Sequence, residues 1–420
     1  MVTVTSRVGG VSSGRGRACT PPVPAARPLR HASDPVSDRP RWEVEGSTIP
    51  EPRAPPHREE PAVVAIAPLH DRFEGVERIA VLRGGGLGDL LFALPAVDAL
   101  AQAYPGAEIT LLGTPAHRVL LGGVGSAIGD VEILPVAQGV RDGEGEDERV
   151  VEDFTARMRG RRFDLAVQLH GGGRYSNPFL ARLGARHTIG SRTPDAAELE
   201  RTVPYLYYQH EMLRALEIVG LAGAAAVRLE PEVPVEPRRR DRLAPALPGA
   251  GPLVMVHPGA TDPRRRWPAA SFADVARALL ADGARVLVVG DASDAVAADE
   301  IVAQAPGAVS WVDVVELGDL PALLSLADVV LGNDSGPRHL AAAVGTPTVG
   351  VFWVGNAINA APLGRGRHRV QLSWTTHCPV CGRDATQVGW TAPRCEHEPS
   401  FVDDVLPASV LADVRELLTR

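Results

Sequence analysis

Short apolar runs alternate with amphipathic segments from about residue 76 to the C-terminus. A run rich in Val, Ile and Leu is typical of a buried strand, and apolar residues three or four positions apart predict a helix. By these criteria the strands of the first half are 78–83, 108–112, 131–135, 164–169 and 186–190, and its helices are 89–104, 150–159, 177–183 and 207–219. Strands that alternate with helices indicate a parallel sheet built from right-handed crossovers.

The same alternation starts again at residue 253. It predicts strands at 253–257, 285–290, 329–331 and 348–352, and helices at 272–281, 295–305, 320–325, 337–344 and 407–420. A Pro- and Arg-rich stretch between the halves is typical of a linker. The sequence therefore predicts two α/β domains, 76–235 and 253–420, joined by a linker at 236–252. Ligands of such a pair would bind in a cleft between the domains, where parallel strands end.

The first 75 residues lack this pattern. They are rich in Pro, Arg, Ser and Gly, and Pro-rich stretches such as 20–24 and 50–56 cannot form helices or strand ladders. We therefore predict a disordered tail over 1–75. The N-terminus lacks the apolar core of a signal peptide, and no apolar run reaches the roughly 18 residues needed to cross a bilayer. These features predict a cytoplasmic protein.

The composition excludes several classes of protein. The formal net charge of -8 and the pI of about 5.9 give no sign of a nucleic-acid partner. All 43 residues counted as Lys or Arg are Arg. The chain therefore has no lysine for a Schiff base with pyridoxal phosphate, nor for a phosphate-binding P-loop.

A glycine loop at 84–88 follows the first strand and leads into a helix at Asp89. A dinucleotide-binding loop would have glycine at position 89 and a carboxylate after the second strand, and this chain has neither. The glycines, among them Gly86 and Gly88, let another backbone or a sugar approach closely. Asp89 is a candidate general base for an acceptor hydroxyl, and an ordinary N-cap of the helix is the alternative.

Two loops of the second half carry charge where strands end. The cluster 264–266, which is Arg-Arg-Arg, is placed to grip a diphosphate, unless it is a solvated basic loop. After the next strand, one of the two carboxylates of Asp291 and Asp294 could accept hydrogen bonds from a ribose or a base. A turn that caps the following helix is the alternative for this second loop.

A third segment, 332–339, joins a strand to a helix that begins near Pro337. The free N–H groups and the dipole of a helix start attract anions, so Ser335 and Gly336 are candidate phosphate donors. His339 lies in the first turn and either reaches the same phosphates or is a packed core residue.

Cysteine is scarce, and three of the four residues cluster in a loop at 377–397. This usage does not indicate a secreted disulfide framework. Cys-Pro-Val-Cys-Gly at 378–382 resembles half of a zinc knuckle, and a complete structural zinc site would use Cys378, Cys381, Cys395 and His397. Reduced thiols packed under a loop, or one disulfide, are the alternatives. Such a metal would be structural, because the protein would supply all its ligands.

The motifs occur in an order that resembles glycosyltransferase family 9, the ADP-heptose:lipopolysaccharide heptosyltransferase family. They are Arg83–Leu90 with Pro95, Arg265–Pro268, and Asn333–His339. The resemblance covers 76–420. It implies the GT-B fold, in which two Rossmann-like domains face each other across a cleft. It also implies an enzyme that transfers a heptose-like sugar, with inversion, from a nucleotide-diphospho-sugar such as ADP-heptose.

The resemblance further implies a role for each motif. Asp89 corresponds to the proposed base. Arg265, followed by Arg266, stands where the family has a lysine that contacts the donor phosphates, and Asp294 is the closest match to the acidic residue that holds the ribose. The segment that holds donor phosphate and sugar corresponds to Asp334, Ser335, Gly336 and His339, and the acceptor side to Gly86, Gly88, His170 and Gly171.

The implied reaction needs no cofactor, since arginine and helix dipoles supply the positive potential for the leaving diphosphate. The acceptor would be a glycan or a lipid-linked hydroxyl of cell-envelope polysaccharide biosynthesis, which would bring the enzyme to the inner face of the plasma membrane. The Arg-only, Ala-rich composition suggests a high-GC genome and leaves the acceptor open. Two alternatives remain: a sugar-nucleotide epimerase or hydrolase, with His170 as its second acid–base group, and a non-catalytic nucleotide-sugar-binding protein.

Overall fold

The structure is a computed structural model that describes residues 66–122, 125–386 and 394–419. Most of the predicted tail, 1–65, lies outside these residues. Among the helices described, none combines the length and the hydrophobicity needed to cross a membrane.

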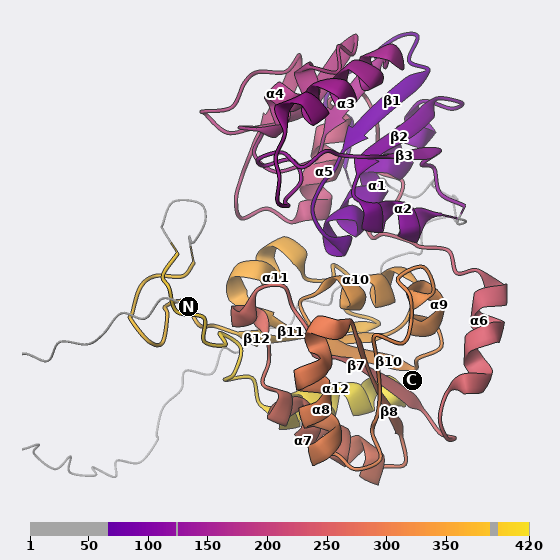
Figure 1. The fold of residues 1–420 in the computed structure, drawn as a ribbon, viewed down its shortest axis with the longest axis vertical. Coiled ribbons are helices and arrows are strands. Elements are labelled where there is room, and N and C mark those ends of the chain that lie inside the picture. Colours follow the sequence, from indigo (N-terminus) through magenta and orange to yellow (C-terminus); the bar gives the residue numbers. More distant parts are fainter. Residues whose placement is uncertain (1–65, 123–124, 387–393, 420) are drawn as a thin grey trace, which may run out of the picture. The chain divides into compact units, whose positions relative to one another are not determined.

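The first half, drawn in indigo to magenta in Figure 1, is built on a six-stranded parallel sheet of order β3-β2-β1-β4-β5-β6. Its strands are β1 (Arg78–Leu82), β2 (Glu108–Gly113), β3 (Asp130–Ile133), β4 (Leu165–Gln168), β5 (His187–Arg192) and β6 (Arg201–Pro204). Its helices are α1 (Leu87–Ala103), α2 (Pro115–Leu121), α3 (Glu148–Gly160), α4 (Ser176–Ala181) and α5 (Glu211–Gly220).

The second half repeats this plan with a parallel sheet of order β12-β11-β10-β7-β8-β9. Its strands are β7 (Leu253–His257), β8 (Arg285–Gly290), β9 (Val309–Val312), β10 (Val329–Asn333), β11 (Thr348–Trp353) and β12 (His368–Ser373). The helices are α6 (Pro237–Leu243), α7 (Ala269–Ala281), α8 (Ala295–Gln304), α9 (Leu320–Leu324), α10 (Gly336–Ala343), α11 (Val354–Ala360) and α12 (Pro407–Leu418), with short 3-10 turns at 244–246, 263–265 and 292–294.

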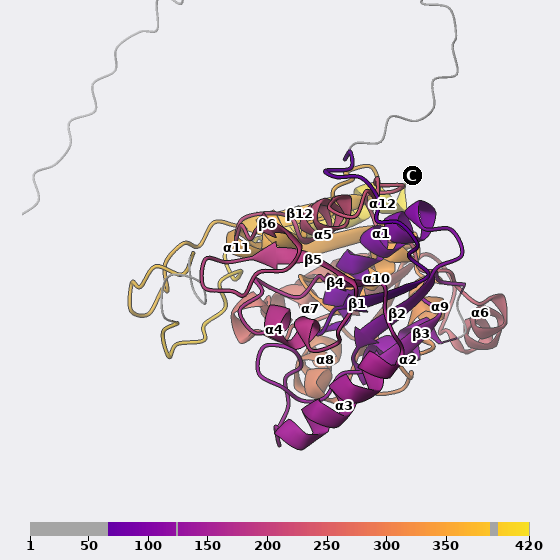
Figure 2. The ribbon, with the colours of Figure 1, turned by 90° about the horizontal axis from the view of Figure 1, so that it is seen from above.

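Helices cover both faces of each sheet, which explains why the strands read as continuous apolar runs. In Figure 2 the first sheet runs from β6 to β3, with α1 and α5 on one side and α3 and α4 on the other. The apolar clusters agree: Val81 packs with the α1 and α5 side chains, and Leu82 packs with those of α3 and α4. In the second half α9 and α10 cover one face, and α7, α8 and α12 cover the other.

One apolar core continues from the first half into the second. It includes Leu216 of α5, Leu323 of α9 and Leu340 of α10. Glycines bring the starts of α1 and α10 together, since a Cβ added at Gly336 would lie only 2.9 Å from Cβ of Leu87. Gly85, in the preceding loop, has φ +85, a conformation that favours glycine. The two loops that the sequence singled out therefore meet.

Every strand and helix predicted from the apolar pattern is present, and the structure adds others. The added strands, β6, β9 and β12, are short or only half-buried, so they lack a continuous apolar run. Helices α2 and α11 are also additional. The predicted linker contains α6, whose Arg239 and Arg242 pair with Asp319. The domain boundaries themselves stay predictions.

Residues before Val76, where the sequence placed the start of folded structure, already pack against the first half. The amide N–H of Leu69 donates to the carbonyl of Gly220 over 2.9 Å. Phe73 is buried, and its ring stacks on His187 with 4.0 Å between centroids. The predicted tail is therefore too long at its C-terminal end, because hydrogen bonds and the buried Phe73 ring tie this segment to the first half.

Candidate functional site

A polar cavity of about 400 Å³ lies where α1 meets α10. Both halves of the chain line it. The residues of the first half are Gly86, Leu87, Gly88, Asp89, Phe92 and Glu211, and those of the second half are Thr261, Arg265, Asp334, Ser335, Gly336, Pro337, His339, Asn356, Asn359 and Ala360. The cavity thus brings together the glycine loop, one of the three arginines and the start of α10, as the sequence predicted.

Asp89 stands in the first turn of α1 with its side chain 46% exposed. One carboxylate oxygen accepts from the amide of Gly86 over 2.8 Å, and the other accepts from the Arg83 guanidinium over 2.6 Å. The N-cap of α1 is Gly86, so the alternative that Asp89 is an ordinary N-cap is wrong; Asp89 is the third residue of the helix and completes a capping box from there. The carboxylate closes a helix cap, and it remains open to the cavity, where it could take a proton from a bound hydroxyl.

Arg83 is buried and contacts Asp89 on the side away from the cavity. Its Nε donates to the Asp89 carbonyl over 2.9 Å, and its Nη1 donates to the carbonyl of Leu169. Its Nη2 also lies 3.4 Å from Glu211, a second carboxylate that lines the cavity. Arg83 thus fixes the direction of the Asp89 side chain, and its charge is shared between two carboxylates.

Asp334 is buried, with only 3% of its side chain exposed, and protein groups occupy its carboxylate. It accepts from Arg265 Nη1 over 3.2 Å, from Asn356 Nδ2 over 2.7 Å and from His339 Nε2 over 2.9 Å. Burial raises the pKa of this carboxyl, but the bond from His339 and the charges of the neighbouring arginines outweigh it and hold the pKa below its ordinary value. Asp334 therefore organises the residues around it.

His339 is a packed residue with both ring nitrogens engaged. Arg338 donates to Nδ1, so Nε2 carries the proton that is shared with Asp334, and the ring is neutral. The ring also packs edge-on against Phe92 at 4.7 Å between centroids. Burial, with the charge of Arg338, lowers the pKa of His339 to about 4. In this state His339 holds Asp334 and has no free nitrogen for a phosphate.

The three arginines of 264–266 have different surroundings. Arg264 is buried and paired with Asp262. Arg265 lines the polar cavity, where its nearest carboxylate is that of Asp334. Arg266 is exposed, does not line the cavity, and donates from Nε to the carbonyl of Ala260 over 2.8 Å. Of the two arginines predicted to bind donor, only Arg265 is brought to the cavity.

An apolar cavity of about 320 Å³ adjoins the polar one, and the two share Leu87 and Pro337. Its other lining residues are His257, Val289, Gly290, Asp291, Trp311, Val315, Leu317, Leu320 and Leu323. An apolar compartment beside a polar one suits a flat base attached to a charged diphosphate. The carboxylate at its rim belongs to Asp291, whereas the sequence favoured Asp294.

Asp294 turns inward instead. Its carboxylate occupies a slot made by two glycines, since a Cβ added at Gly259 or Gly290 would lie 2.1 Å or 2.4 Å from a carboxylate oxygen. There it lies 3.4 Å from Nε2 of His257, whose Nδ1 is 3.1 Å from the hydroxyl of Ser335. Burial raises the pKa of Asp294, but the bond and charge of His257 outweigh it and lower the pKa.

The remaining predicted acceptor-side residues lie elsewhere. His170 and Gly171 line a hollow of about 590 Å³ in the first half, together with Tyr175, Thr193 and Asp195. Burial and the charge of Arg83 lower the pKa of His170 to about 4, so its ring is neutral at pH 7. His170 and Gly171 thus do not line the polar cavity, although His170 lies beside the glycine loop, where a Cβ added at Gly84 would be 3.1 Å from its Cε1.

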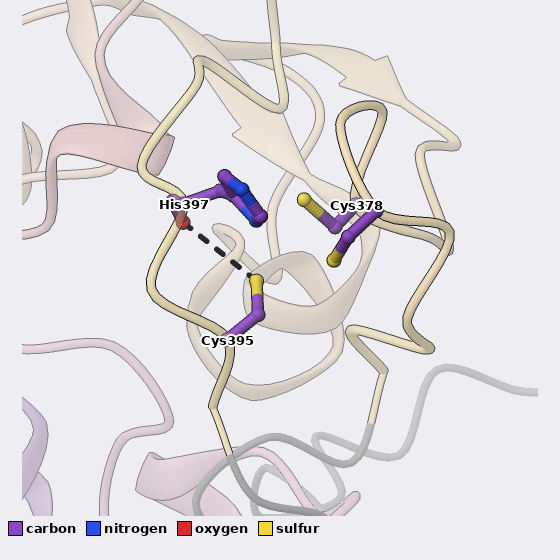
Figure 3. Close-up of side chains that lie close together, drawn as sticks. Cys378, Cys395 and His397 are labelled. Atoms are coloured by element: carbon purple, nitrogen blue, oxygen red, sulfur yellow. Dashed lines mark hydrogen bonds between the residues drawn. The ribbon is translucent and has the colours of Figure 1, made fainter. Parts of the chain in front are cut away.

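The cysteine cluster forms as predicted. One ligand atom from each of Cys378, Cys381, Cys395 and His397 lies within 4.8 Å of all the others. The labelled side chains in Figure 3 point toward one another. Nδ1 of His397 is buried and has no hydrogen-bond partner. Three sulfurs and one imidazole at this separation could hold a metal ion.

The segment that follows this cluster supports the arginine loop. The amide of Phe401 donates to the Arg264 carbonyl over 2.7 Å, and the Ser400 hydroxyl donates to the Arg266 carbonyl over 2.7 Å. The Trp267 indole donates to the carbonyl of Val405 over 3.0 Å. The backbone on both sides of Arg265 is therefore fixed by residues 400–405.

Sequence reasoning missed several lining residues. Glu211 begins a helix whose apolar pattern says nothing of a site, and Asn356 lies on a helix that was not predicted. Trp311 belongs to the half-buried strand β9. No local motif marks any of the three, because only tertiary contacts bring them to the cavities.

Comparison with known proteins identifies the family of this chain. The model of glycosyltransferase family 9 (heptosyltransferase) matches residues 151–386, more than half of the chain. Lipopolysaccharide heptosyltransferase 1 of Pseudomonas aeruginosa is 25% identical over 321 residues, covering 72% of this chain and 86% of that protein.

Solved structures share the fold. A glycosyl transferase family 9 protein from Veillonella parvula has a TM-score of 0.66 at 17% identity, covering 82% of this chain and 97% of that one. The ADP-heptose LPS heptosyltransferase II of E. coli has a TM-score of 0.62 at 19% identity, covering 82% and 98%. The chain therefore has the GT-B fold, belongs to glycosyltransferase family 9, the heptosyltransferase family, and is a glycosyltransferase.

Proposed function

We propose that this chain transfers a heptose-like sugar from ADP-heptose or a close analogue to a hydroxyl of a cell-envelope glycan or lipid-linked acceptor, with inversion. One observation carries the proposal. The cavity sets an exposed carboxylate, Asp89, on one side and a guanidinium with a helix start, Arg265 and Gly336, on the other. This is the charge arrangement that a single displacement at an anomeric carbon requires.

The donor side of the proposal uses both cavities. Arg265 and the first turn of α10 would meet the diphosphate, and the apolar cavity would take the base against Trp311, with Asp291 near the ribose. Adenine is favoured because the related E. coli enzyme is named for ADP-heptose. On binding, the diphosphate would compete with Asp334 for Arg265.

The acceptor side uses Asp89, which would remove the hydroxyl proton as that oxygen attacks. Because Arg83 fixes the direction of the carboxylate, little reorganisation is needed in the step. The related Pseudomonas enzyme is named for lipopolysaccharide, which favours an acceptor of that class.

The test is Asp89→Asn, assayed with ADP-heptose and a panel of glycan and lipid-linked acceptors. We expect the transfer rate to fall by about 10²- to 10⁴-fold, as for loss of a general base, while the affinity for ADP stays close to that of the wild type. Asp98→Asn, on the same helix but outside the cavity, is the matched control. NMR of the product should show an inverted anomeric configuration. Unchanged transfer in the Asp89 variant would refute the assignment.

We also propose that the cysteine cluster holds a structural zinc ion. The ligand set has one imidazole and three thiol groups, which suits zinc, and the orphan Nδ1 of His397 supplies a free lone pair. The ion would hold the segments 378–382 and 395–397 together and, through 400–405, support the arginine loop.

Metal analysis of the purified protein should find about one zinc per chain. Dialysis against a strong chelator, or Cys395→Ser, should remove the metal and lower the thermal unfolding temperature. If the analysis found iron instead of zinc, the identity of the ion would be wrong, but the metal site would stand. Less than about half an equivalent of any metal would refute it.

A further inference from the structure

Asp294, His257 and Ser335 form a continuous chain of polar contacts beside the polar cavity. Ser335 Oγ lies 3.1 Å from Nδ1 of His257, and Nε2 of the same ring lies 3.4 Å from the Asp294 carboxylate. His257 and Asp294 are buried, whereas Ser335 lines the cavity where the proposed function places the diphosphate. The chain thus leads from a buried carboxylate to a hydroxyl at the ligand.

The Ser335 hydroxyl is available for this role because it does not cap α10. Ser335 occupies the N-cap position, where a serine side chain usually accepts from the helix amides, yet it makes no such bond. It is turned toward His257, with the carbonyl of Asn333 as a second neighbour at 3.4 Å.

The other end of the chain is built for a carboxylate. Two glycines, Gly259 and Gly290, leave the space that the Asp294 side chain fills, and any Cβ there would collide with it. The amide of Asp291 also donates to Asp294 over 3.2 Å. A buried carboxylate next to imidazole stabilises the imidazolium and fixes the orientation of the ring.

We propose that Asp294, His257 and Ser335 are a proton relay that ends at the leaving phosphate of the donor. This inference rests on the proposed function. Ser335 would touch the phosphate, and His257 and Asp294 are positioning residues behind it. Binding of the diphosphate places a second anion near His257, so the ring takes up a proton in the complex.

The relay would act during the transfer step itself. The acceptor oxygen bonds to the anomeric carbon while the bond from that carbon to the phosphate oxygen breaks, and the bonding pair leaves on that oxygen. Ser335 Oγ gives its proton to this oxygen, and Nδ1–H of His257 passes to Oγ, which leaves His257 neutral. The acceptor's own proton goes to Asp89.

Other charged groups lie near this chain of contacts. Asp291 lines the same apolar cavity, and Arg266 acts on Asp294 through its charge. Arg265 faces the polar cavity next to Ser335. Because the two arginines oppose protonation, the uptake depends on Asp294 and on the bound phosphates.

The experiment measures proton uptake on ADP binding by calorimetry in two buffers of different ionisation enthalpy, near pH 7.5. We expect the wild type to take up a fraction of a proton. His257→Asn can still hydrogen-bond to Ser335 through its amide but cannot titrate, so it should bind ADP with less than tenfold loss and lose that uptake.

His368→Asn is the matched control. His368 is also buried, with Nδ1 3.0 Å from the Thr348 hydroxyl, but it lines neither cavity. Its variant should keep the wild-type uptake. Equal uptake in wild type and His257→Asn would overturn the relay while leaving the proposed function intact. A wild type that does not bind ADP would instead contradict the proposed function.

Discussion

The starts of α1 and α10 occupy equivalent positions in the two halves but have different surroundings. Each follows a strand of its own sheet through a short loop, and each has one aspartate nearby: Asp89 in the first turn of α1, and Asp334 in the loop before α10. The side chain of Asp89 is 46% exposed, whereas that of Asp334 is 3% exposed. Exposure, rather than residue type, separates a carboxylate that can exchange a proton from one that organises its neighbours.

The difference arises from what packs on each loop. At α1 a single buried arginine, Arg83, reaches the carboxylate from one side and leaves the cavity side open. At α10 three donors, from Arg265, His339 and Asn356, surround it. The first half thus leaves the proposed acid–base group open to the cavity, and the second half fixes the groups that are proposed to meet phosphate.

The largest effect that tests this comparison is on stability. Asp334→Ala would leave the surrounding arginine and histidine donors without their anion, and we expect the free energy of unfolding to fall by about 3–5 kcal/mol. Asp89→Ala removes a half-exposed cap and should cost about 1 kcal/mol or less. Denaturant unfolding of both variants measures this, and equal losses would show that the two sites do not differ as described.

A second effect concerns pH. Since the pKa of His339 is about 4 in the folded chain and ordinarily about 6.5, the unfolded chain binds more protons between these values. The contribution of His339 to the free energy of unfolding is therefore fully present above pH 6.5. It is lost as the pH falls toward 4 and amounts to about 3 kcal/mol. His339→Gln, which can still donate to Asp334, should remove that part of the acid slope in unfolding curves. A slope unchanged in the variant would mean that other groups cause it.

The smallest of the three effects is on donor affinity. Arg265→Met should weaken ADP binding by about ten- to a hundredfold, the equivalent of losing a hydrogen bond to a charged group. Arg266→Met serves as the matched control, because Arg266 does not line the polar cavity. Titration calorimetry measures the ADP affinity of both variants and of the wild type. A comparable loss in both variants would mean that the arginines act through general charge.

Much of the fold and of the candidate site could be predicted from the sequence. The apolar runs predicted both parallel sheets, since strands buried on two faces must be continuously apolar. The glycine loop, the arginine cluster, the segment 333–339 and the cysteine spacing predicted which loops matter, because each is a short contiguous motif. Which aspartate of the loop after β8 faces a cavity was harder to predict. Asp291 and Asp294 lie in the same short motif, and only the space left by Gly259 and Gly290 decides that Asp294 turns inward.

The sequence by itself determined the two α/β halves, the loops that end their strands, and the four residues of the cysteine cluster. Only the tertiary structure decided which side chains of those loops face the cavities. It exposed Asp89 and enclosed Asp334, brought in Glu211 and Asn356, and set His257 between Asp294 and Ser335. The physical reason is that a motif fixes the backbone locally, whereas burial and partners depend on segments far apart in the chain.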